Sequence, residues 1–548
     1  MDSTVLLDAA VVTRCRRRVH LEHDPAVADT PRATLDATAA RRIADAAAHR
    51  RFVADRLAAY HPAEWAEIPP GLPAEQRCSA TLALLIGGAP FVWGGLLLAD
   101  PQSGRRGGVE LLVRHHGGYL PVIVVRHKVT DPGSGARTSS LAQPTLVRTD
   151  PKRKVRPQSR DQLRLAHAVR LLQAAGLATR GRATGGVIGL EADVVVWHDL
   201  HAPTWPGGRT AMAEYDARFA DRLAVARAAA TEEQPLAQPS RVTECRSCPW
   251  WPLCGPALRA SRDVSLVLRG EDAVALRAAG LSTVDELAAL DPAGDPPVPM
   301  AGMSFRDAVL LARAWQRDLT LVRRNRRITV PRADVEVDVD MESFDESGAY
   351  LWGCLLSGSD IGIPKGYRAF ATWEPVPTPD EARSFAAFWG WLTEVRTRAA
   401  ERGLSFAAYC YNEQAENRWM FSSAERFACA PGIPTAAAVQ EFISSGQWVD
   451  LYAVVSAEFL CAHGKGLKTI APAAGFSWHD PEASGENSMR WYSDAVGLGG
   501  APPDLAQRAR LLTYNADDVG ATRALRLWMS SEQVNDVPYA GDLITVRP

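Results

Sequence analysis

Acidic residues occupy every second position of a short valine-rich run, EVDVDME at 336–342. Side chains of a strand alternate between its two faces, so the four acids Glu336, Asp338, Asp340 and Glu342 would share one face. Neighbouring carboxylates there lie about 7 Å apart and repel by about 2.4 kcal/mol at an effective dielectric of about 20. Water, protonation or a cation must relieve this repulsion. A solvated acidic face and a metal site are the two interpretations.

Two further acidic segments follow at spacings that suit metal chemistry. Segment 411–416, YNEQAE, follows an expected strand, and 514–518 reads YNADD. Tyr514 and Asp518 are one helical turn apart and therefore share a helix face. A strand pair, a strand-end acid and a helix acid can converge on two divalent ions, the arrangement that hydrolyses phosphodiesters. Taken in order, the three motifs favour a metal site over a solvated face.

Cysteines form a second group that suits metal binding. Segment 245–254, CRSCPWWPLC, places Cys245, Cys248 and Cys254 in a C-x2-C-x5-C spacing. A [4Fe–4S] cluster needs a fourth ligand, for which Cys15 is the candidate. A zinc site of four cysteines, or of three and a histidine, and unliganded thiols are the alternatives. The remaining cysteines are scattered and are expected to be core residues.

The cysteine pattern resembles a known family. A lone N-terminal cysteine, an α/β body and a terminal C-x2-C-x5-C are similar to the iron–sulfur nucleases of the RecB/AddB type, which have a PD-(D/E)xK core. With the C-terminal half included, the chain resembles RecB-like nucleases fused to a YprB-type ribonuclease H-like domain. The resemblance implies a restriction-endonuclease-like N-terminal fold that is held together by a [4Fe–4S] cluster.

The N-terminal nuclease site is expected to be degenerate. Glu110, in GGVELLV, stands where the resemblance requires the first metal-binding acid, and Gln162 matches a helical glutamine of some members. Residues 123–125 read Ile-Val-Val where acid-x-Lys belongs, and apolar side chains cannot ligate Mg²⁺. We therefore expect this domain to bind nucleic acid without cutting it. The alternative is an active site of altered geometry that uses Glu110 and Lys128.

Basic residues near this site are expected to grip phosphates, although a solvated loop also explains the run. The candidates are Arg126, His127, Lys128, Lys152, Arg153, Lys154 and Arg156.

The acids of the C-terminal part are similar to the motifs of DEDD exonucleases of the ribonuclease H-like fold, in the subtype with tyrosine in the last motif. By that resemblance, Asp340 bridges two metal ions and Glu342 and Asp518 complete the first site. Tyr514 would position the attacking water. The family's middle Asn-x3-Asp motif corresponds to Asn412 and Glu416, and Glu413 is the rival ligand.

Three more residues are expected near this site. Asp450, in WVDLYAVV, would bind a metal through water or support another ligand. The segment 464–478, GKGLKTIAPAAGFSW, also resembles the YprB-type domain. Its Lys465 and Lys468 would contact the substrate backbone.

The elements that must position these residues indicate an α/β protein. At 548 residues the chain is expected to form two or three domains. We expect a restriction-endonuclease-like domain at 1–260, a helical hairpin linker at 261–330 that is wholly helical, and a ribonuclease H-like domain at 331–548. The expected helices are 39–60, 160–175, 379–402, 413–427 and 516–530, with a hairpin at 275–290, and the expected strands are 108–114, 119–126, 187–197, 336–342, 349–356 and 405–411.

Composition narrows the class of protein. The net charge of −2 excludes a polycation, so any nucleic-acid surface must be local. Nine cysteines, a start unlike a signal peptide and the absence of a long apolar run predict a cytoplasmic protein that does not enter a membrane. No Walker motif occurs, so ATP-driven motion would come from a helicase partner.

The sequence therefore predicts a Mg²⁺- or Mn²⁺-dependent nuclease. Digestion of single-stranded DNA from the 3′ end, in DNA repair or recombination, is what the resemblance implies, with the degenerate iron–sulfur domain holding the nucleic acid. The alternative is a catalytically inactive nucleic-acid-binding scaffold or helicase accessory protein.

Overall fold

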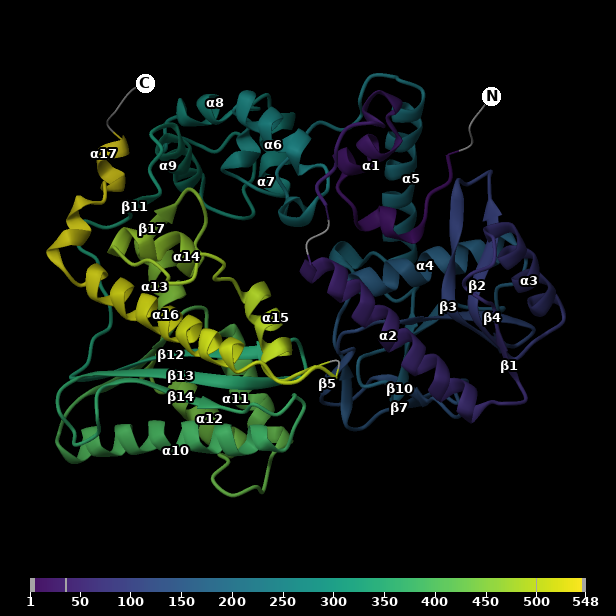
Figure 1. Ribbon diagram of the computed structural model, residues 1–548. Coiled ribbons are helices and arrows are strands. Elements are labelled where there is room, and N and C mark those ends of the chain that lie inside the picture. Colours follow the sequence, from purple (N-terminus) through teal and green to yellow (C-terminus); the bar gives the residue numbers. More distant parts are fainter. Residues whose placement is uncertain (1–4, 35–36, 499, 545–548) are drawn as a thin grey trace. The chain divides into compact units, whose positions relative to one another are not determined.

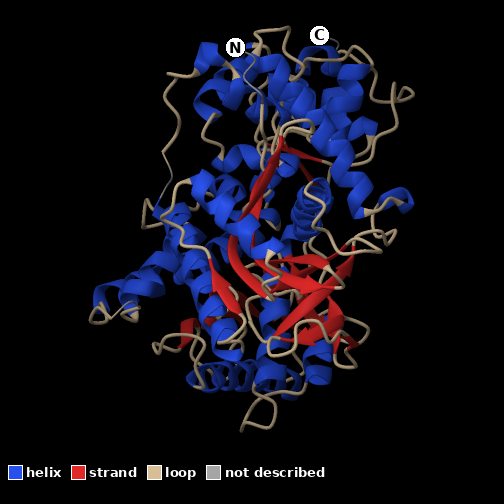
Figure 2. Ribbon diagram, turned by 90° about the vertical axis from the view of Figure 1, so that its right-hand side faces the viewer, coloured by secondary structure: helices blue, strands red, loops and turns tan. Residues whose placement is uncertain are grey.

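The computed structural model describes residues 5–34, 37–498 and 500–544. The chain is a mixed α/β protein that divides into two compact units, Met1–Leu258 and Arg259–Pro548 (Figure 1). Helices pack against the strands of several sheets (Figure 2). All four candidate cluster cysteines belong to the first unit, and all the candidate acids of the 336–518 region belong to the second.

An eight-stranded sheet ordered β1-β2-β3-β4-β9-β10-β6-β7 forms the centre of the first unit. Most neighbours are antiparallel, but β4 runs parallel to β9 and β1 runs parallel to β2. The strands are β1 Trp65–Glu67, β2 Phe91–Asp100, β3 Arg105–His115, β4 Gly118–Val124, β6 Arg137–Ser140, β7 Arg148–Thr149, β9 Thr184–Ile188 and β10 Val194–Asp199. A separate ladder joins β5 Thr130–Pro132 to β8 Arg153–Val155.

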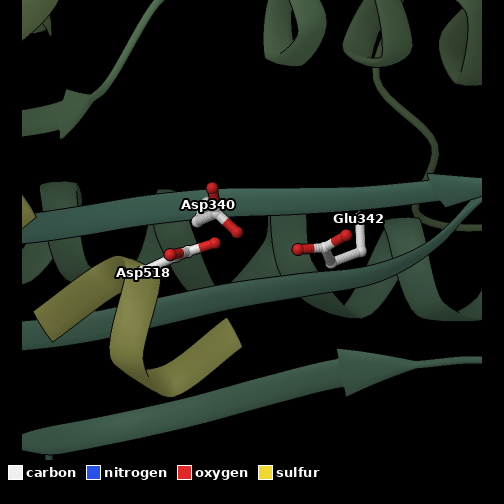
Figure 3. A group of neighbouring side chains, drawn as sticks. All are labelled: Asp340, Glu342 and Asp518. Atoms are coloured by element: carbon white, nitrogen blue, oxygen red, sulfur yellow. The ribbon is translucent and has the colours of Figure 1, made fainter. Parts of the chain in front are cut away.

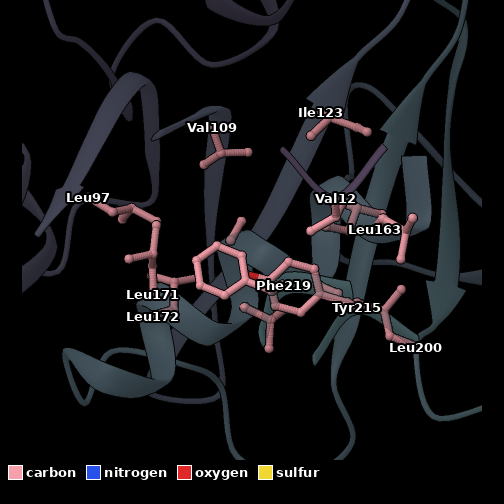
Figure 4. Close-up of a cluster of buried hydrophobic side chains, with 14 of the residues drawn as sticks. Val12, Leu97, Val109, Ile123, Leu163, Leu171, Leu172, Leu200, Tyr215 and Phe219 are labelled. Atoms are coloured by element: carbon pink, nitrogen blue, oxygen red, sulfur yellow. The ribbon is translucent and has the colours of Figure 1, made fainter. Parts of the chain in front are cut away.

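Helices bury both faces of this sheet. The helices of the unit are α1 Arg16–His23, α2 Ala37–Tyr60, α3 Ala74–Ile86, α4 Ser159–Ala174, α5 Ala211–Ala230 and, across the unit boundary, α6 Trp251–Ala260. Ile123 of β4 packs in one cluster with Leu163 of α4 and Phe219 of α5 (Figure 4). Its neighbours Val122 and Val124 pack in another cluster with residues of α2. This alternation explains why every residue of β4 is buried.

The predictions for this unit are confirmed for both helices and for strands 108–114 and 119–126, within a few residues at their ends. The single strand predicted at 187–197 is wrong, because the segment forms two antiparallel strands, β9 and β10, in which Ile188 pairs with Val195. The turn between them contains Ala192 at a φ of 50°. The turn was not predicted, because Leu190 and Ala192 continue the apolar pattern of the flanking strands.

The second unit begins with helices. These are α7 Glu271–Ala278, α8 Val284–Ala288 and α9 Phe305–Gln316. The predicted hairpin is confirmed, since Gly280 turns the chain at a φ of 87° and Thr283 caps α8 in a reciprocal capping box with Glu286. The prediction of a wholly helical 261–330 is wrong, because β11 Leu321–Arg323 pairs with β17 Phe459–Cys461.

A five-stranded sheet ordered β14-β13-β12-β15-β16 forms the centre of this unit. Its strands are β12 Val335–Phe344, β13 Gly348–Gly358, β14 Gly366–Ala371, β15 Phe406–Cys410 and β16 Trp448–Asp450. The first three are antiparallel neighbours, whereas β15 runs parallel to both β12 and β16. The acidic run 336–342 thus lies in the central strand of the sheet, and this confirms its prediction as a strand.

Helices cover both faces of this sheet too. The remaining helices are α10 Asp380–Glu401, α11 Gln414–Arg426, α12 Ala436–Ser444, α13 Leu451–Glu458, α14 Leu467–Ile470, α15 Gly485–Ala495, α16 Leu505–Met529 and α17 Ala540–Ile544. The apolar residues of β12, such as Val337 and Val339, pack with Phe385 of α10 and Trp419 of α11. The long helix α16 lies across β12 (Figure 1). Its start is eleven residues earlier than the predicted 516.

None of the described helices combines the length and the apolar composition that crossing a bilayer requires.

Candidate metal centre

The four acids of β12 divide into two pairs that have different partners. Arg526 of α16 donates hydrogen bonds to both Glu336 and Asp338, and its Nη2 lies 2.7 Å from Asp338 Oδ2. Asp340 and Glu342 instead face Asp518 (Figure 3). The length of α16 from Asp518 to Arg526, about 12 Å, matches the length of β12 from Glu336 to Asp340, about 13 Å. Because these lengths match, one helix supplies a cation to the first pair of acids and an acid to the second pair.

Three carboxylates form a tight group on the second pair's side. Ligand oxygens of Asp340, Glu342 and Asp518 all lie within 4.8 Å of one another. Asp340 is half-buried, and Glu342 and Asp518 are buried at 8% and 7% exposure. Figure 3 shows the three side chains pointing toward one another from β12 and α16. This spacing allows one divalent cation to touch all three.

Repulsion among these carboxylates favours a bound cation. Burial raises the pKa of Glu342 to about 8, and the neighbouring charge of Asp518 adds to this effect. Burial and the charges of Asp518 and Glu342 also raise the pKa of Asp340 well above its usual value. Without a cation, the site therefore retains protons that free carboxyl groups release. Hard oxygen ligands of this kind suit Mg²⁺ or Mn²⁺.

Neighbouring side chains fix the orientation of each carboxylate. Asn515 Nδ2 donates to Asp340 Oδ2 over 2.7 Å, and Trp478 Nε1 donates to Asp518 Oδ1 over 2.6 Å. Ser488 Oγ donates to Glu342 Oε2 over 3.1 Å. Asp518 is also hydrogen-bonded to Tyr514, so each acid is held by at least one neighbouring side chain. None of the other three supporting residues was predicted, because nothing in their local spacing distinguishes them.

Tyr514 and Lys468 lie beside the acids. Lys468 Nζ donates to Tyr514 Oη over 3.1 Å, and its charge favours ionised Asp340, Glu342 and Asp518. Burial and the carboxylates raise the pKa of Tyr514, so its hydroxyl stays protonated. Lys465 is placed differently. Its charge acts on Cys461, and its backbone carbonyl accepts a hydrogen bond from Tyr411.

Glu416 approaches the group from α11. It is buried at 4% exposure, and its Oε2 has no hydrogen-bond partner. Burial raises the pKa of Glu416 to about 8, and its charge in turn raises the pKa of Asp340. An orphaned buried carboxylate oxygen is costly unless a ligand satisfies it. The residue therefore fits the place of a further metal ligand.

Asp450 supports the loop that leads to Glu416. Its Oδ1 accepts the backbone N–H of Asn412 over 2.9 Å and that of Tyr452 over 2.8 Å, so it caps α13. Asn412 has a φ of 69°, and the contact with Asp450 holds that conformation. Glu413, the rival ligand, precedes α11, and its charge also raises the pKa of Glu416. Asp450 thus holds the loop before Glu416, and the charge of Glu413 helps to raise the pKa of Glu416.

The four candidate cluster cysteines meet in the first unit. Cys15, Cys245, Cys248 and Cys254 line one small pocket, although Cys15 is 230 positions before Cys245. Glu244 ties the two segments together, because it accepts the Cys15 backbone N–H over 2.6 Å and an Arg18 hydrogen bond over 2.7 Å. Burial raises the pKa of Cys245 and Cys248, and that of Cys254 to about 11.

The residues of the N-terminal nuclease motif are engaged with other groups. Glu110 accepts a hydrogen bond from Arg164 over 3.0 Å, and Gln162 accepts one from Trp205 over 3.1 Å. Residues 123–125 are buried in the core. Lys128 follows β4 and is half-buried. The geometry offers no group of three carboxylate, imidazole or thiolate ligands here, within the described residues.

Several predicted phosphate-gripping residues pair with acids. Arg126 lies 3.4 Å from Asp45, and Arg153 lies 2.5 Å from Asp193. His127 lies 2.9 Å from Asp161. The charges of Arg126 and Arg153 are thus partly neutralised inside the unit.

A comparison with known families adds an independent finding. Residues 412–530 match the family model RNase_H_2 of the RNase_H superfamily. The match contains Glu416, Asp450, Tyr514 and Asp518 and begins after β12, which supplies Asp340. No curated protein and no solved structure matches the chain. The C-terminal part of the chain is therefore a ribonuclease H-like domain, and this domain type indicates a nuclease function and nucleic acid as partner.

Proposed function

We propose that the protein is a divalent-metal-dependent exonuclease that removes nucleotides from the 3′ end of single-stranded DNA during repair or recombination. The observation that carries the proposal is the group of Asp340, Glu342 and Asp518, whose oxygens lie within 4.8 Å of one another in a ribonuclease H-like domain. Bound Mg²⁺ or Mn²⁺ would activate water and stabilise charge on the attacking and leaving oxygens of a phosphodiester.

The side chains of the site have separate roles in this proposal. Asp340, Glu342 and Asp518 would hold one cation, and Asp340 and Glu416 would hold a second. The protonated hydroxyl of Tyr514 would donate a hydrogen bond that orients the attacking water. Lys468, which already donates to Tyr514, would contact a substrate phosphate. Asp450 would keep Glu416 in place through Asn412.

The first unit, in this proposal, is a RecB/AddB-type nuclease-like domain that holds nucleic acid without cutting it. The Glu110–Arg164 pair and the buried apolar residues at 123–125 support a degenerate site. A helicase partner would supply single strands, because the chain has no Walker motif. The sequence boundaries 1–260, 261–330 and 331–548 remain our proposal for the domains.

A [4Fe–4S] cluster on Cys15, Cys245, Cys248 and Cys254 is part of the proposal. The proposal is supported by the four cysteines that line one pocket, although they come from two distant segments of the chain. Glu244 joins the segments that would hold the cluster.

The nuclease proposal is tested with end-labelled single-stranded DNA and Mn²⁺. Wild-type protein should release nucleotides from the 3′ end, and Asp340→Ala should abolish release. Asp360→Ala, which alters an exposed acid of the same unit, should retain activity and controls for the loss of a charge. Binding without cleavage by the wild type, with every divalent ion, would instead establish the nucleic-acid-binding scaffold.

The cluster proposal has its own test. Protein purified without oxygen should absorb at about 400 nm, as iron–sulfur clusters do, and contain four iron atoms for each chain. Cys248→Ser should lower both values, whereas Cys429→Ser, at an exposed cysteine outside the pocket, should not. A colourless protein with stoichiometric zinc would contradict the assignment.

A further inference from the structure

A cavity of about 560 Å³ in the first unit includes Glu110 of the proposed degenerate nuclease site. Its walls come from α2, α3 and the strands β1, β2 and β3. Three arginines line it, Arg50 and Arg51 from α2 and Arg77 from α3, together with the acids Glu67 and Glu110. We call it the arginine cavity. Its opening and its size admit a ligand such as a phosphorylated sugar.

Both acids of the arginine cavity already have cationic partners. Arg51 lies 2.5 Å from Glu67 and also donates to Asp55 over 2.9 Å. Glu110 accepts from Arg164, which comes from α4. Because these charges are matched, the acids do not make the cavity a cation site.

The other two arginines are not matched. Among the described residues, Arg50 and Arg77 have no carboxylate partner. Arg77 Nη2 donates to the Gly94 carbonyl over 3.0 Å, and its buried Nε has no acceptor. A buried donor without an acceptor costs free energy that a ligand oxygen would recover. The guanidinium donors that have no carboxylate partner therefore suit an anion.

We propose that the arginine cavity binds a phosphate group of a nucleic-acid strand. Guanidinium groups present paired donors that match phosphate oxygens, and two unmatched positive charges favour an anion. The proposal deepens the role of the first unit and rests on the proposed function, because the ribonuclease H-like domain implies a nucleic-acid partner. In this proposal Arg50 and Arg77 bind the phosphate, whereas Arg126 and Arg153 pair with acids of the unit itself.

The test measures the binding of fluorescent single-stranded DNA to the full chain in a chelator, so that no cleavage occurs. Arg50→Ala with Arg77→Ala should weaken binding at least about tenfold, the loss expected for charge-assisted hydrogen bonds. The slope of log affinity against log salt should become shallower by about one to two units. Arg56→Ala is the matched control, because Arg56 is on α2 but faces the ring of Phe52 outside the cavity.

A second readout separates a strand phosphate from free phosphate. If inorganic phosphate stabilises the wild type through Arg50 and Arg77 while the affinity for DNA stays unchanged, the strand assignment is overturned. Equal DNA affinity of the double variant and of Arg56→Ala overturns it as well. Arg50→Ala alone and Arg77→Lys guard against misfolding, because both should fold and should show a partial loss. Failure of the proposed nuclease is distinguishable, since Asp340→Ala should abolish cleavage and leave this binding intact.

Discussion

Asn515 Nδ2 lies 2.7 Å from Asp340 Oδ2, and this hydrogen bond joins α16 to the centre of β12. Asn515 is fully buried, and its Oδ1 accepts the hydroxyl of Tyr367 over 2.7 Å. Gly353 pairs with Asp340 on the neighbouring strand, and a Cβ there would lie 1.6 Å from Asn515 Oδ1. The strand, the glycine and the amide thus fix one carboxylate in one orientation.

Removal of this support should weaken the metal site. Asn515→Ala should lower Mn²⁺ affinity about 10- to 100-fold, as loss of a group that orients a ligand does. Gly353→Ala should have the same effect, because its methyl group displaces the amide. Tyr367→Phe should reduce affinity less, since it leaves the Asn515–Asp340 bond in place. Calorimetric titration measures these affinities, and unchanged binding in Asn515→Ala would show that Asp340 needs no such support.

Arg526 should stabilise the fold rather than the chemistry. Arg526→Met leaves Asp338 buried without a cation and Glu336 with Arg332 as its remaining cation, and it should lower the free energy of unfolding by about 3–5 kcal/mol. Adding Glu336→Gln and Asp338→Asn should recover part of this loss. Urea unfolding provides the measurement, with Arg523→Met, at an exposed position of α16, as the control. Equal stability of the two arginine variants would contradict this role.

The acidic group should destabilise the protein when no metal is bound. Folded Glu342 keeps its proton up to about pH 8, whereas unfolded glutamate loses it near 4.5. The metal-free protein should therefore lose stability as the pH rises between these values. Asp518→Asn removes the neighbouring charge that helps raise the pKa of Glu342 and should make this decline shallower. Urea unfolding in a chelator at both pH values measures it, and a steeper decline in the variant would exclude charge repulsion at the site.

His167 should make the first unit sensitive to acid. Its ring bonds to Tyr215 Oη over 2.8 Å and to the Arg106 carbonyl over 2.9 Å, and burial lowers the pKa of His167 to about 4. Between about pH 6.5 and 4 the unfolded chain binds a proton that the folded chain does not. Stability should therefore fall by about 3 kcal/mol as the pH drops through this window.

The pH dependence of unfolding measures this effect. His167→Gln should flatten the decline, and His116→Gln, at an exposed histidine, should leave it unchanged. Identical slopes in the wild type and His167→Gln would assign the acid sensitivity to other groups.

Local spacing was sufficient to predict that Asp340 and Glu342 share one face of a strand and that Asp518 lies on a helix. The alternation of β12 and the helical turn between Tyr514 and Asp518 are properties of consecutive residues. Partners far away in the chain were not predictable in this way. Arg526 meets Glu336 only because α16 crosses β12, and Asn515 meets Asp340 only because Gly353 leaves room. The turn at 189–193 was missed because Leu190 and Ala192 continue the apolar pattern of the flanking strands, and β11 was missed because a three-residue strand has no period.

Titration of Mn²⁺ into the metal-free full chain tests most directly whether Asp340, Glu342 and Asp518 form a metal centre. We expect saturable binding by the wild type, loss of that binding in Asp518→Asn, and wild-type binding in Asp360→Asn. Saturable binding that Asp518→Asn leaves unchanged would contradict this expectation, because the ions would then be held elsewhere.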